Sequence, residues 1–212
     1  MKIGIIGAGR MGRALGRRWA MAGHDVAISF SRDQHKLEKV ARELGGKAQA
    51  TTPVEAVKTA DAILFAVHWR TLELALSEAG SLRKKTVLTC TLPMNEDDSD
   101  LVLGHTTSGA EELARRSDAS VVAIFDTITS ELINDDAQVA RSKPDVIYCG
   151  DDDSSKSVAA RLARDAGFNP IDAGALRIAR YLEPFGLLVA QLAYEQELGD
   201  TTGYRVLIPN DQ

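Results

Sequence analysis

The feature that most limits the possible folds of this chain is a glycine-rich segment near its start. Gly7, Gly9 and Gly12 directly follow the aliphatic run 2–6, and apolar residues then recur at helical spacing over residues 11–22. A Gly-x-Gly-x-x-Gly pattern alone is weak evidence, but its place between a strand and a helix is typical of a dinucleotide-binding turn. Gly7 would permit the tight turn, Gly9 the approach of a pyrophosphate, and Gly12 close helix packing. The alternative is a glycine-rich turn without a ligand.

The backbone N–H groups at the start of this helix would face an anion, which the helix dipole also favours. Arg10 and Arg13 stand in the first helical turn, where cations oppose the dipole unless an anion is bound. For Arg13, a solvated side chain explains the position equally well. The candidate cofactor-binding residues of the loop are Gly7, Ala8, Gly9, Arg10, Met11 and Gly12.

The end of the second predicted strand, at 25–30, distinguishes between the two nicotinamide cofactors. An NAD site places Asp or Glu there, roughly 20 residues past the loop, to bind the ribose hydroxyls. This chain has Ser31 and Arg32 instead, with Asp33 as the N-cap of the next helix and Lys36 one helical turn later. A hydroxyl and two cations suit a 2′-phosphate. The sequence therefore predicts NADP(H), held by Ser31, Arg32 and Lys36.

Strand-like and helix-like segments alternate along most of the chain. Strands are predicted at 2–6, 25–30, 62–67, 86–89, 119–125 and 145–149, and helices at about 70–79, 111–116, 154–166 and 178–198. This alternation indicates right-handed β-α-β crossovers. The expected fold is α/β: a Rossmann-type, doubly wound, mostly parallel sheet with a small C-terminal helical or α+β extension. The expected boundaries are a dinucleotide-binding domain over 1–175 and an extension over 176–212.

The composition argues against several classes of function. The chain has 212 residues, with 25 Lys and Arg against 30 Asp and Glu and 5% aromatic residues, so it lacks the basic stripe and stacking rings of a nucleic-acid surface. No apolar run approaches the roughly 20 residues of a membrane span. Cys90 and Cys149 lie far apart, as expected of a reduced, cytoplasmic protein.

No metal site is expected. The four histidines do not pair at the spacing of metal ligands. The acidic segment 151–154 is better explained as the start of a helix, with Asp153 as its N-cap, than as a magnesium site.

The strand at 62–67 ends at the edge where open parallel sheets bind ligands. Ala66, Val67 and His68 are therefore predicted to cover the ribose and nicotinamide of the cofactor, whereas Trp69 is better explained as a residue at the edge of the core. Reduction of a carbonyl needs a positioned proton donor, and the sequence offers no evident relay. Hydride transfer between two redox rings needs mainly orientation and exclusion of water, and the residues favour that chemistry.

Two later segments carry a resemblance to a known family. Residues 149–156 (CGDDDSSK) and 170–176 (PIDAGAL) correspond to a Cys-Gly-Asp-Asp-x-x-x-Lys motif and an Asp-Ala-Gly-x-Leu motif in the same order. Together with Ser31, Arg32, Lys36 and the segment 67–69, they make nearly the whole chain similar to the coenzyme F420-dependent NADP oxidoreductases. The tail at 203–207 resembles the short C-terminal strand of that family.

The resemblance implies a domain that carries NADP(H), a C-terminal part that completes an acceptor cleft, and usually a dimer. The implied acceptor is the deazaflavin of coenzyme F420; relatives of the fold also reduce flavins such as FMN and FAD, or ferric and other metal chelates. His68 stands where the family usually has Pro, and Asp126 where it usually has His or Asn. A carboxylate at 126 would repel an electron-rich ring. The acceptor-side candidates are His68, Asp126 and Thr127, and no catalytic group is assigned.

Two other functions stay open. An imine or carbonyl reductase on the same N-terminal half would need a proton donor, for which His68 is the nearest candidate. A non-catalytic NADPH-binding or sensing protein would act through the helix at 178–198. One apolar face of this helix, formed by Leu182, Phe185, Val189 and Leu192, either packs on its own subunit or forms a homodimer interface. The predicted partners are a small-molecule redox acceptor and a second copy of the chain.

Overall fold

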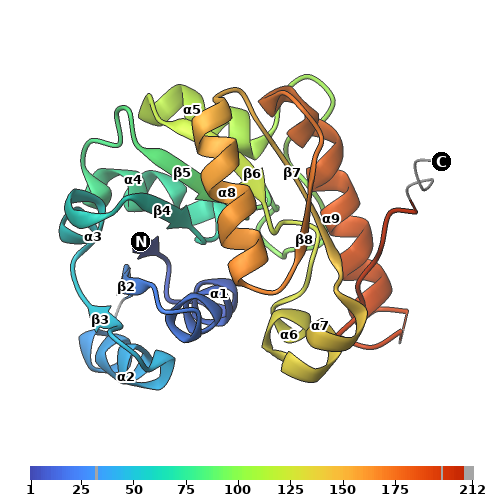
Figure 1. Cartoon of the computed structure of the whole chain (residues 1–212). Helices are drawn as coiled ribbons and strands as arrows, with labels where there is room; N and C mark the ends of the chain where they lie inside the picture. The colour runs from blue at the N-terminus through green and yellow to red at the C-terminus, as the bar shows by residue number, and fades with distance from the viewer. Residues whose placement is uncertain (32, 197, 208–212) are drawn as a thin grey trace.

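A computed structural model describes residues 1–31, 33–196 and 198–207 of the chain. One eight-stranded sheet carries helices on both faces, which confirms the predicted Rossmann-type α/β fold (Figure 1). The strands are β1 (Lys2–Ile6), β2 (Asp25–Ser29), β3 (Gln49–Ala50), β4 (Ala62–Phe65), β5 (Thr86–Thr89), β6 (Ser120–Ile124), β7 (Asp145–Gly150) and β8 (Asn169–Asp172).

The order of the strands is β3-β2-β1-β4-β5-β6-β7-β8. Every neighbouring pair is parallel except β6 with β7, so the sheet is mostly parallel, as predicted. The direction of winding reverses between β1 and β4. In doubly wound sheets this reversal leaves a crevice beyond the carboxyl ends of the strands, and ligands bind there.

Two layers of helices cover the sheet. The helices are α1 (Arg10–Met21), α2 (Gln34–Leu44), α3 (Pro53–Thr59), α4 (Leu72–Ala79), α5 (Gly109–Ser117), α6 (Ser130–Asn134), α7 (Asp136–Ser142), α8 (Asp153–Asp165) and α9 (Ala179–Tyr194), with short 3-10 helices η1 (Trp69–Thr71) and η2 (Leu176–Ile178). Buried residues of α1, α2, α6, α7 and α8 share one apolar cluster. Those of α3, α4, α5 and the start of α9 share a second cluster on the other face.

The central strands are buried on both sides, which explains their uninterrupted aliphatic sequences. Along β1, Ile3 and Ile5 pack in the first cluster and Ile6 in the second. Along β4, Leu64 packs in the first cluster and Phe65 in the second. Because both faces are fixed by packing, the loops at the carboxyl ends of these strands start from well-defined positions.

The C-terminal part differs from the prediction. The helix expected at 178–198 is divided into η2 and α9, and α9 ends at Tyr194, because the chain turns back there to contact the loop after β6. The tail at 203–207 forms no strand among the described residues. It is attached to the start of β7 by two hydrogen bonds, from the Asp145 N–H to the Tyr204 carbonyl at 3.1 Å and from the Val206 N–H to Asp145 Oδ2 at 2.5 Å.

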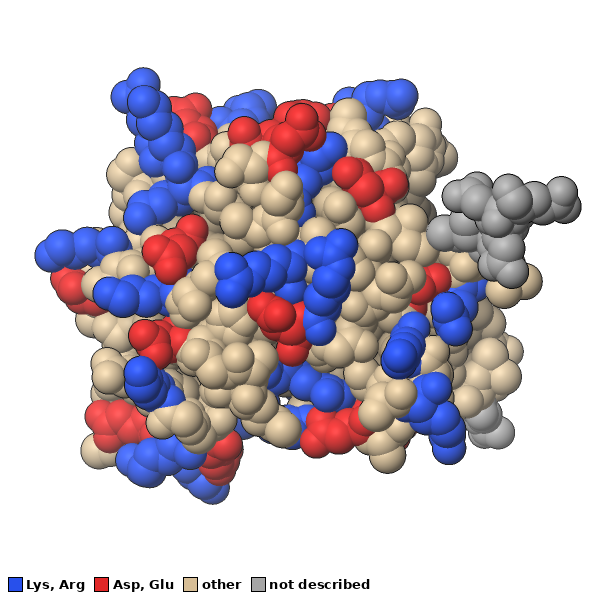
Figure 2. Space-filling model, in the orientation of Figure 1, with Lys and Arg blue, Asp and Glu red and all other residues tan. Residues whose placement is uncertain are grey.

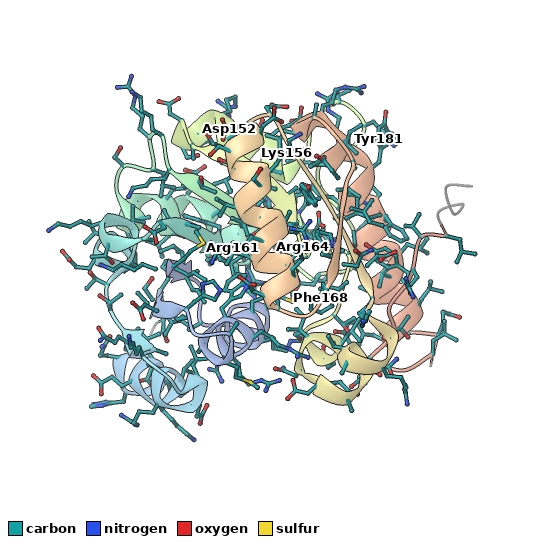
Figure 3. All side chains as sticks on the ribbon, in the orientation of Figure 1. Asp152, Lys156, Arg161, Arg164, Phe168 and Tyr181 are labelled. Carbon is teal, nitrogen blue, oxygen red and sulfur yellow. The ribbon has the colours of Figure 1, made fainter. Side chains whose placement is uncertain are left out.

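The acidic segment that carried the family resemblance has a structural role at the start of α8 (Figure 3). Asp152 is the N-cap, accepting a hydrogen bond of 2.7 Å from the N–H three residues later, so the prediction of Asp153 as the cap was wrong by one position. Asp153 instead lies 3.1 Å from Lys156 Nζ, which also reaches Asp172 at 3.3 Å. Asp151 accepts from the first N–H of η2 at 2.8 Å. These contacts join α8 to the turn after β8.

Charged side chains of both signs are interspersed on the face drawn in Figure 2, where Lys and Arg alternate with Asp and Glu. Over the described ranges, no helix combines the length and the apolar character that crossing a bilayer requires.

Candidate functional site

The loop between β1 and α1 has a backbone that only glycine allows at two positions. Gly7 has φ +120°, and a Cβ there would overlap the carbonyl oxygen of Ala66 at the end of β4. A Cβ at Gly12 would overlap the carbonyl oxygen of Gly7. Gly9 is different, because a Cβ there would meet no atom of the described residues within 4 Å. Packing therefore does not demand glycine at this position, and open space lies beside the backbone where α1 begins.

Among the residues that the structure describes, no side chain caps the N-terminus of α1. Gly9 is the N-cap, and the first turn of the helix contains no acidic residue. The first N–H groups of a helix have no acceptor within the helix, so here they are left for water or a ligand. Arg13 Nε donates a hydrogen bond of 2.9 Å to the Ala8 carbonyl, so Arg13 stabilises the loop itself. Arg10 extends away from the loop to Glu131, with 3.1 Å between Nη1 and Oε1.

A cavity of about 420 Å³, called here the first cavity, opens on one side of the glycine loop at the reversal between β1 and β4. Its lining residues are Gly7, Ala8, Gly9, Phe30, Ser31, Ala66, Val67, His68, Arg70, Thr71, Leu74 and Glu78. Val67 is buried, and its carbonyl accepts from Thr91 Oγ1 at 3.0 Å, which fixes the end of β4 against the end of β5. The side chain of His68 is exposed. The structure thus brings the glycine loop together with Ser31 and with the end of β4.

The predicted 2′-phosphate site lies at the end of β2. Phe30 has φ +63°, and this left-handed turn leads into Ser31, whose Oγ donates to the Asp33 carbonyl at 3.1 Å. Asp33 accepts from the Lys36 N–H at 3.1 Å, which confirms it as the N-cap of α2. The Lys36 side chain is 74% exposed and remains accessible to a ligand. Arg32, the third member of the site, lies outside the described residues.

A smaller cavity of about 160 Å³, called here the second cavity, lies on the other side of the loop. Its lining residues come from α1, α6, α9 and the ends of β5 and β6: Arg10, Met11, Cys90, Leu92, Phe125, Asp126, Ile128, Thr129, Ser130, Gly186, Val189, Ala190 and Tyr194. The residues predicted to surround a pair of rings are therefore divided, since Ala66, Val67 and His68 line the first cavity and Asp126 the second. Thr127 is fully buried and shares a hydrogen bond of 2.6 Å with the Tyr204 hydroxyl.

Asp126 is held by an unusual backbone turn at the end of β6. Phe125 has φ +67°, a conformation that a bulky side chain rarely adopts, and its buried ring packs edge-on against Trp19 and Phe168. This packing compensates for the strain and directs the next residue to the second cavity. Asp126 is 7% exposed, and its Oδ1 has no hydrogen-bond partner among the described residues. Burial raises the pKa of this carboxyl to about 7.

The loop after β6 is enclosed by α9 and by the tail. A Cβ at Gly186 would overlap the carbonyl oxygen of Asp126, so α9 touches the backbone of the loop directly. Thr129 Oγ1 donates to the Asp200 carbonyl at 2.6 Å, and the rings of Phe185 and Tyr204 pack edge-on at 5.0 Å. The sequence analysis missed Gly186, and it gave Tyr204 no role of its own beyond the tail at 203–207. A glycine inside an apolar helix was the available signal for Gly186.

A polar bridge connects the glycine loop to the end of α9. Glu131 binds Arg10 through Oε1, and its Oε2 accepts a hydrogen bond of 2.7 Å from the Tyr194 hydroxyl. The Arg10 guanidinium also lies 6.0 Å from the centre of the Tyr194 ring. The pattern of residue types did not indicate this bridge, because its members come from three separate elements.

The Cys90 thiol is poorly suited to nucleophilic chemistry. Burial raises the pKa of the Cys90 thiol to about 12, so the group stays protonated at neutral pH and is a poor nucleophile. Within residues 1–31, 33–196 and 198–207, no cluster of three or more His, Cys, Asp or Glu side chains could hold a metal ion.

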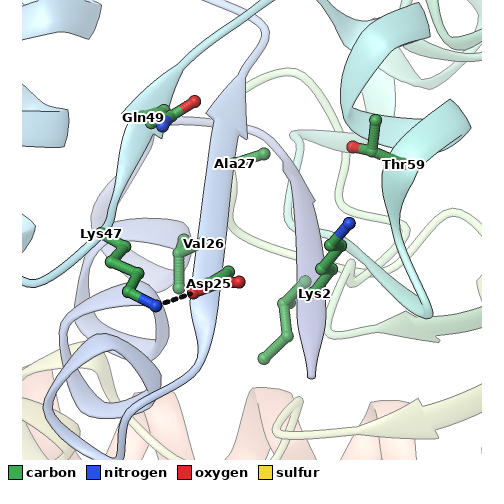
Figure 4. A pocket seen from close by; sticks show the side chains of 8 residues that line it. Lys2, Asp25, Val26, Ala27, Lys47, Gln49 and Thr59 are labelled. Atoms are coloured by element: carbon green, nitrogen blue, oxygen red, sulfur yellow. Dashed lines mark ion pairs between the residues drawn. The ribbon is translucent and has the colours of Figure 1, made fainter.

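A third hollow, of about 240 Å³, lies near the amino ends of β1 and β2 (Figure 4). Lys47 and Asp25 both line it, and Lys47 Nζ and Asp25 Oδ1 form an ion pair of 3.7 Å. Doubly wound sheets bind their ligands at the carboxyl ends of the strands. This hollow is at the opposite end, so it is not part of the candidate site.

Comparison with known proteins gives a family match, one relative in sequence and two solved structures of similar fold. Residues 2–93 match the model of a family described as NADP oxidoreductase, coenzyme F420-dependent. Over 187 residues, 88% of this chain, the sequence is 30% identical to the metalloreductase STEAP3 of Rattus norvegicus, and the match spans 36% of that protein. A crystal structure of a candidate F420-dependent NADP reductase from Arthrobacter sp. FB24 is similar with a TM-score of 0.87 and 22% identity, over 98% of this chain and 100% of that one.

A reductive aminase from Aspergillus terreus, in complex with NADPH4, cyclohexanone and allyl amine, has a TM-score of 0.64 and 18% identity, over 92% of this chain and 62% of that one. The two solved structures show that the fold is shared. The family match and the STEAP3 match show similarity in sequence as well. Together they confirm the resemblance expected from the motifs: residues 2–93 match the model of the coenzyme F420-dependent NADP oxidoreductase family, and most of the chain is similar in sequence to part of STEAP3.

Proposed function

We propose that the chain is an NADPH-dependent oxidoreductase that transfers a hydride between the nicotinamide of NADP(H) and a ring acceptor. The acceptor would be the deazaflavin of coenzyme F420 or a flavin such as FMN or FAD, with ferric chelates as onward electron acceptors. The observation that carries the proposal is the open space beside Gly9, at an uncapped helix N-terminus that adjoins the first cavity. The match of residues 2–93 to the family model supports it.

The residues present fit a dinucleotide. The N–H groups at the start of α1 would bind the pyrophosphate, because the backbone at Gly9 carries no side chain that would exclude it. At about 420 Å³ the first cavity has the size of a small-molecule site. Ser31, Arg32 and Lys36 would bind the 2′-phosphate through a hydroxyl and two cations.

Bound NADPH supplies the hydride from C4 of its nicotinamide ring. The chain contributes orientation and exclusion of water. The wall of the second cavity is largely apolar, with Met11, Leu92 and Val189 among its lining residues. The bridge from Arg10 through Glu131 to Tyr194 ties the glycine loop to α9, so both sides of this cavity are held together.

The first test is spectroscopic. Oxidation of NADPH by the purified protein is followed with coenzyme F420, then FMN and FAD, then ferric chelates, then small imines and carbonyls. Turnover with a deazaflavin or flavin would support the proposal. Turnover restricted to imines or carbonyls would reject the ring acceptor, and binding of NADPH without any turnover would indicate a non-catalytic NADPH-binding or sensing protein.

The second test concerns the choice of cofactor. Arg32→Ala should weaken NADPH binding by about 1–3 kcal/mol, the scale of a hydrogen bond to a charged group, and leave NADH binding unchanged. Lys39→Ala is the matched control, because Lys39 lies on the exposed side of α2 next to Glu43. Equal losses for both cofactors would show that Arg32 does not bind the 2′-phosphate. Absence of binding at millimolar NADPH would reject the whole proposal.

A homodimer through the 178–198 helix is the second part of the proposal. The face formed by Leu182 and Val189 is buried within the subunit, so intramolecular packing accounts for it. A neighbouring side of α9 exposes 60% of Tyr181, labelled in Figure 3, and 52% of Leu188, and this second apolar face is the surface that a partner subunit would cover.

An imine or carbonyl reductase is the second candidate function, and a specific observation favours it. Such an enzyme needs a proton donor beside the acceptor. The sequence analysis gave His68 as the candidate donor. In the structure, the buried carboxyl of Asp126 lines the second cavity and is a second candidate donor.

A further inference from the structure

The carboxyl of Asp126 is a group that dinucleotide binding does not explain. It lines the second cavity, is 7% exposed, and leaves Oδ1 without a partner among the described residues. A buried carboxylate oxygen without a hydrogen bond is costly, because it loses its hydration without compensation. The strained turn at Phe125 and the close contact with Gly186 hold Asp126 in place nevertheless.

A second buried carboxyl has the hydrogen-bond partners that are expected of an acid with a purely structural role. Glu183 of α9 is 2% exposed, and both of its oxygens are bonded: Oε2 accepts from the Gly109 N–H at 2.9 Å and Oε1 from the Ala110 N–H at 3.0 Å. Glu183 thereby caps α5. Asp126 is also buried, at 7% exposure, but its Oδ1 has no partner among the described residues, so a molecule bound in the second cavity can supply one.

We propose that Asp126 is the proton donor of the reaction, and that the acceptor gains a hydride at one end of a C=N unit and a proton on nitrogen at the other. The unit can be a simple imine or the conjugated C=N system of a flavin or deazaflavin. This inference rests on the proposed function and deepens it by naming the chemical class of the acceptor.

The step balances with the groups already named. As the hydride adds to one end of the C=N system, the π bond breaks and its electron pair moves to nitrogen. The proton leaves the Asp126 carboxyl for that nitrogen, the carboxyl becomes a carboxylate, and water later returns the proton. NADPH is the only reductant that the step requires.

The surroundings of Asp126 favour the protonated form. The titratable groups that face it from the packed elements are Cys90 after β5, Cys149 on β7, Glu183 on α9, Tyr204 in the tail and, across the cavity, Arg10 and Tyr194. Burial raises the pKa of Tyr204 to about 12 and that of Glu183 to about 8. Neither group therefore supplies a positive charge that would favour the carboxylate form of Asp126. Arg10 is the cation of the group, and it is paired with Glu131. With a pKa near 7, Asp126 holds its proton up to neutral pH.

The first readout is binding, which needs no turnover. For the hydride and the proton to reach one acceptor, the proposal requires the nicotinamide to extend from the first cavity to the edge of the second, beside Asp126. An oxidised nicotinamide is positively charged and favours a carboxylate there, so Asp126 should release its proton when NADP⁺ binds but not when NADPH binds. Calorimetry at pH 6–7 in two buffers of different ionisation enthalpy measures this release. The affinity for NADP⁺ should accordingly rise about tenfold as the pH increases through 7, if the pKa of Asp126 falls by about one.

The second readout is the pH profile of turnover. In the wild-type chain kcat should fall above pH 7, as Asp126 loses its proton. Asp126→Asn should lower kcat by about 100-fold or more, the usual contribution of a general acid, and should abolish both the pH dependence and the proton release. Glu183→Gln is the matched control: it removes the other buried carboxyl of raised pKa at the loss of one of the two hydrogen bonds that cap α5, and it should preserve both the pH dependence and the proton release.

Each outcome decides the matter. Equal proton release with NADP⁺ and NADPH in the wild-type chain overturns the inference even if Asp126→Asn does not fold. So does an Asp126→Asn variant that keeps the wild-type pH profile, or a profile that follows Glu183 instead. In all three cases the proposed function stands, since NADPH still binds and is oxidised; its own failure would appear as loss of NADPH binding or turnover in the wild-type chain.

Discussion

At the scale of single residues, replacement of Gly9 should affect NADPH binding, whereas replacement of Gly7 should affect the stability of the fold. Gly9→Val should leave thermal unfolding nearly unchanged, because a side chain there meets no described atom within 4 Å. The same valine would occupy the place proposed for the pyrophosphate, so NADPH affinity should fall on the order of 100-fold or more, the loss of about two charge-assisted hydrogen bonds. Calorimetric titration and a melting curve measure the two effects.

Gly7→Ala is the matched comparison. Its φ of +120° and the overlap with the Ala66 carbonyl should destabilise the fold by about 1–3 kcal/mol whether or not a ligand is present. Unchanged NADPH binding by Gly9→Val would contradict the placement of the pyrophosphate.

The sequence predicted those site residues whose role depends on a single continuous segment of the chain. The glycines, Ser31 and the Asp33 cap belong to one continuous segment each, so their roles could be inferred from spacing. The left-handed backbone at Phe30 and Phe125 could not, because aromatic residues rarely adopt it and tertiary packing imposes it here.

At the scale of elements, the contact between α9 and the loop after β6 depends on one missing side chain. Gly186→Ala should push α9 away from the Asp126 carbonyl and reduce the free energy of unfolding by about 1–3 kcal/mol, the usual cost of an overpacked contact. Denaturant titration measures the change. Gly104→Ala, where a Cβ meets no described atom within 4 Å, should have little effect; equal losses in both variants would contradict the close approach of α9.

The central strands were predictable because burial on both faces gives them uninterrupted aliphatic sequences. The edge strands were not. β3 has two residues, and β8 contains Pro170 and a single aliphatic side chain, Ile171, so neither carries a strong pattern. The end of α9 was placed too late because its stop is set by contacts of the tail with Thr127 and Thr129, which local sequence does not encode.

At the scale of the whole molecule, the exposed face of α9 predicts the state of association. The wild-type chain should sediment as a dimer, and Leu188→Lys should convert it to a monomer, because a charge would be buried in an apolar interface. Val54→Lys is the control, since Val54 is 50% exposed on α3, far from α9 in the sheet order, and should leave the dimer intact. A monomeric wild-type chain would contradict the proposed interface.

The backbone between β1 and α1 lies between the first and the second cavity, because Gly9 lines the first and Arg10 lines the second. A ligand in one cavity that displaces this backbone alters the affinity of the other cavity for its own ligand. Thermodynamic reciprocity makes the effect equal in both directions. Cofactor and acceptor would thus influence each other's binding through this loop, in addition to the ring contact that hydride transfer requires.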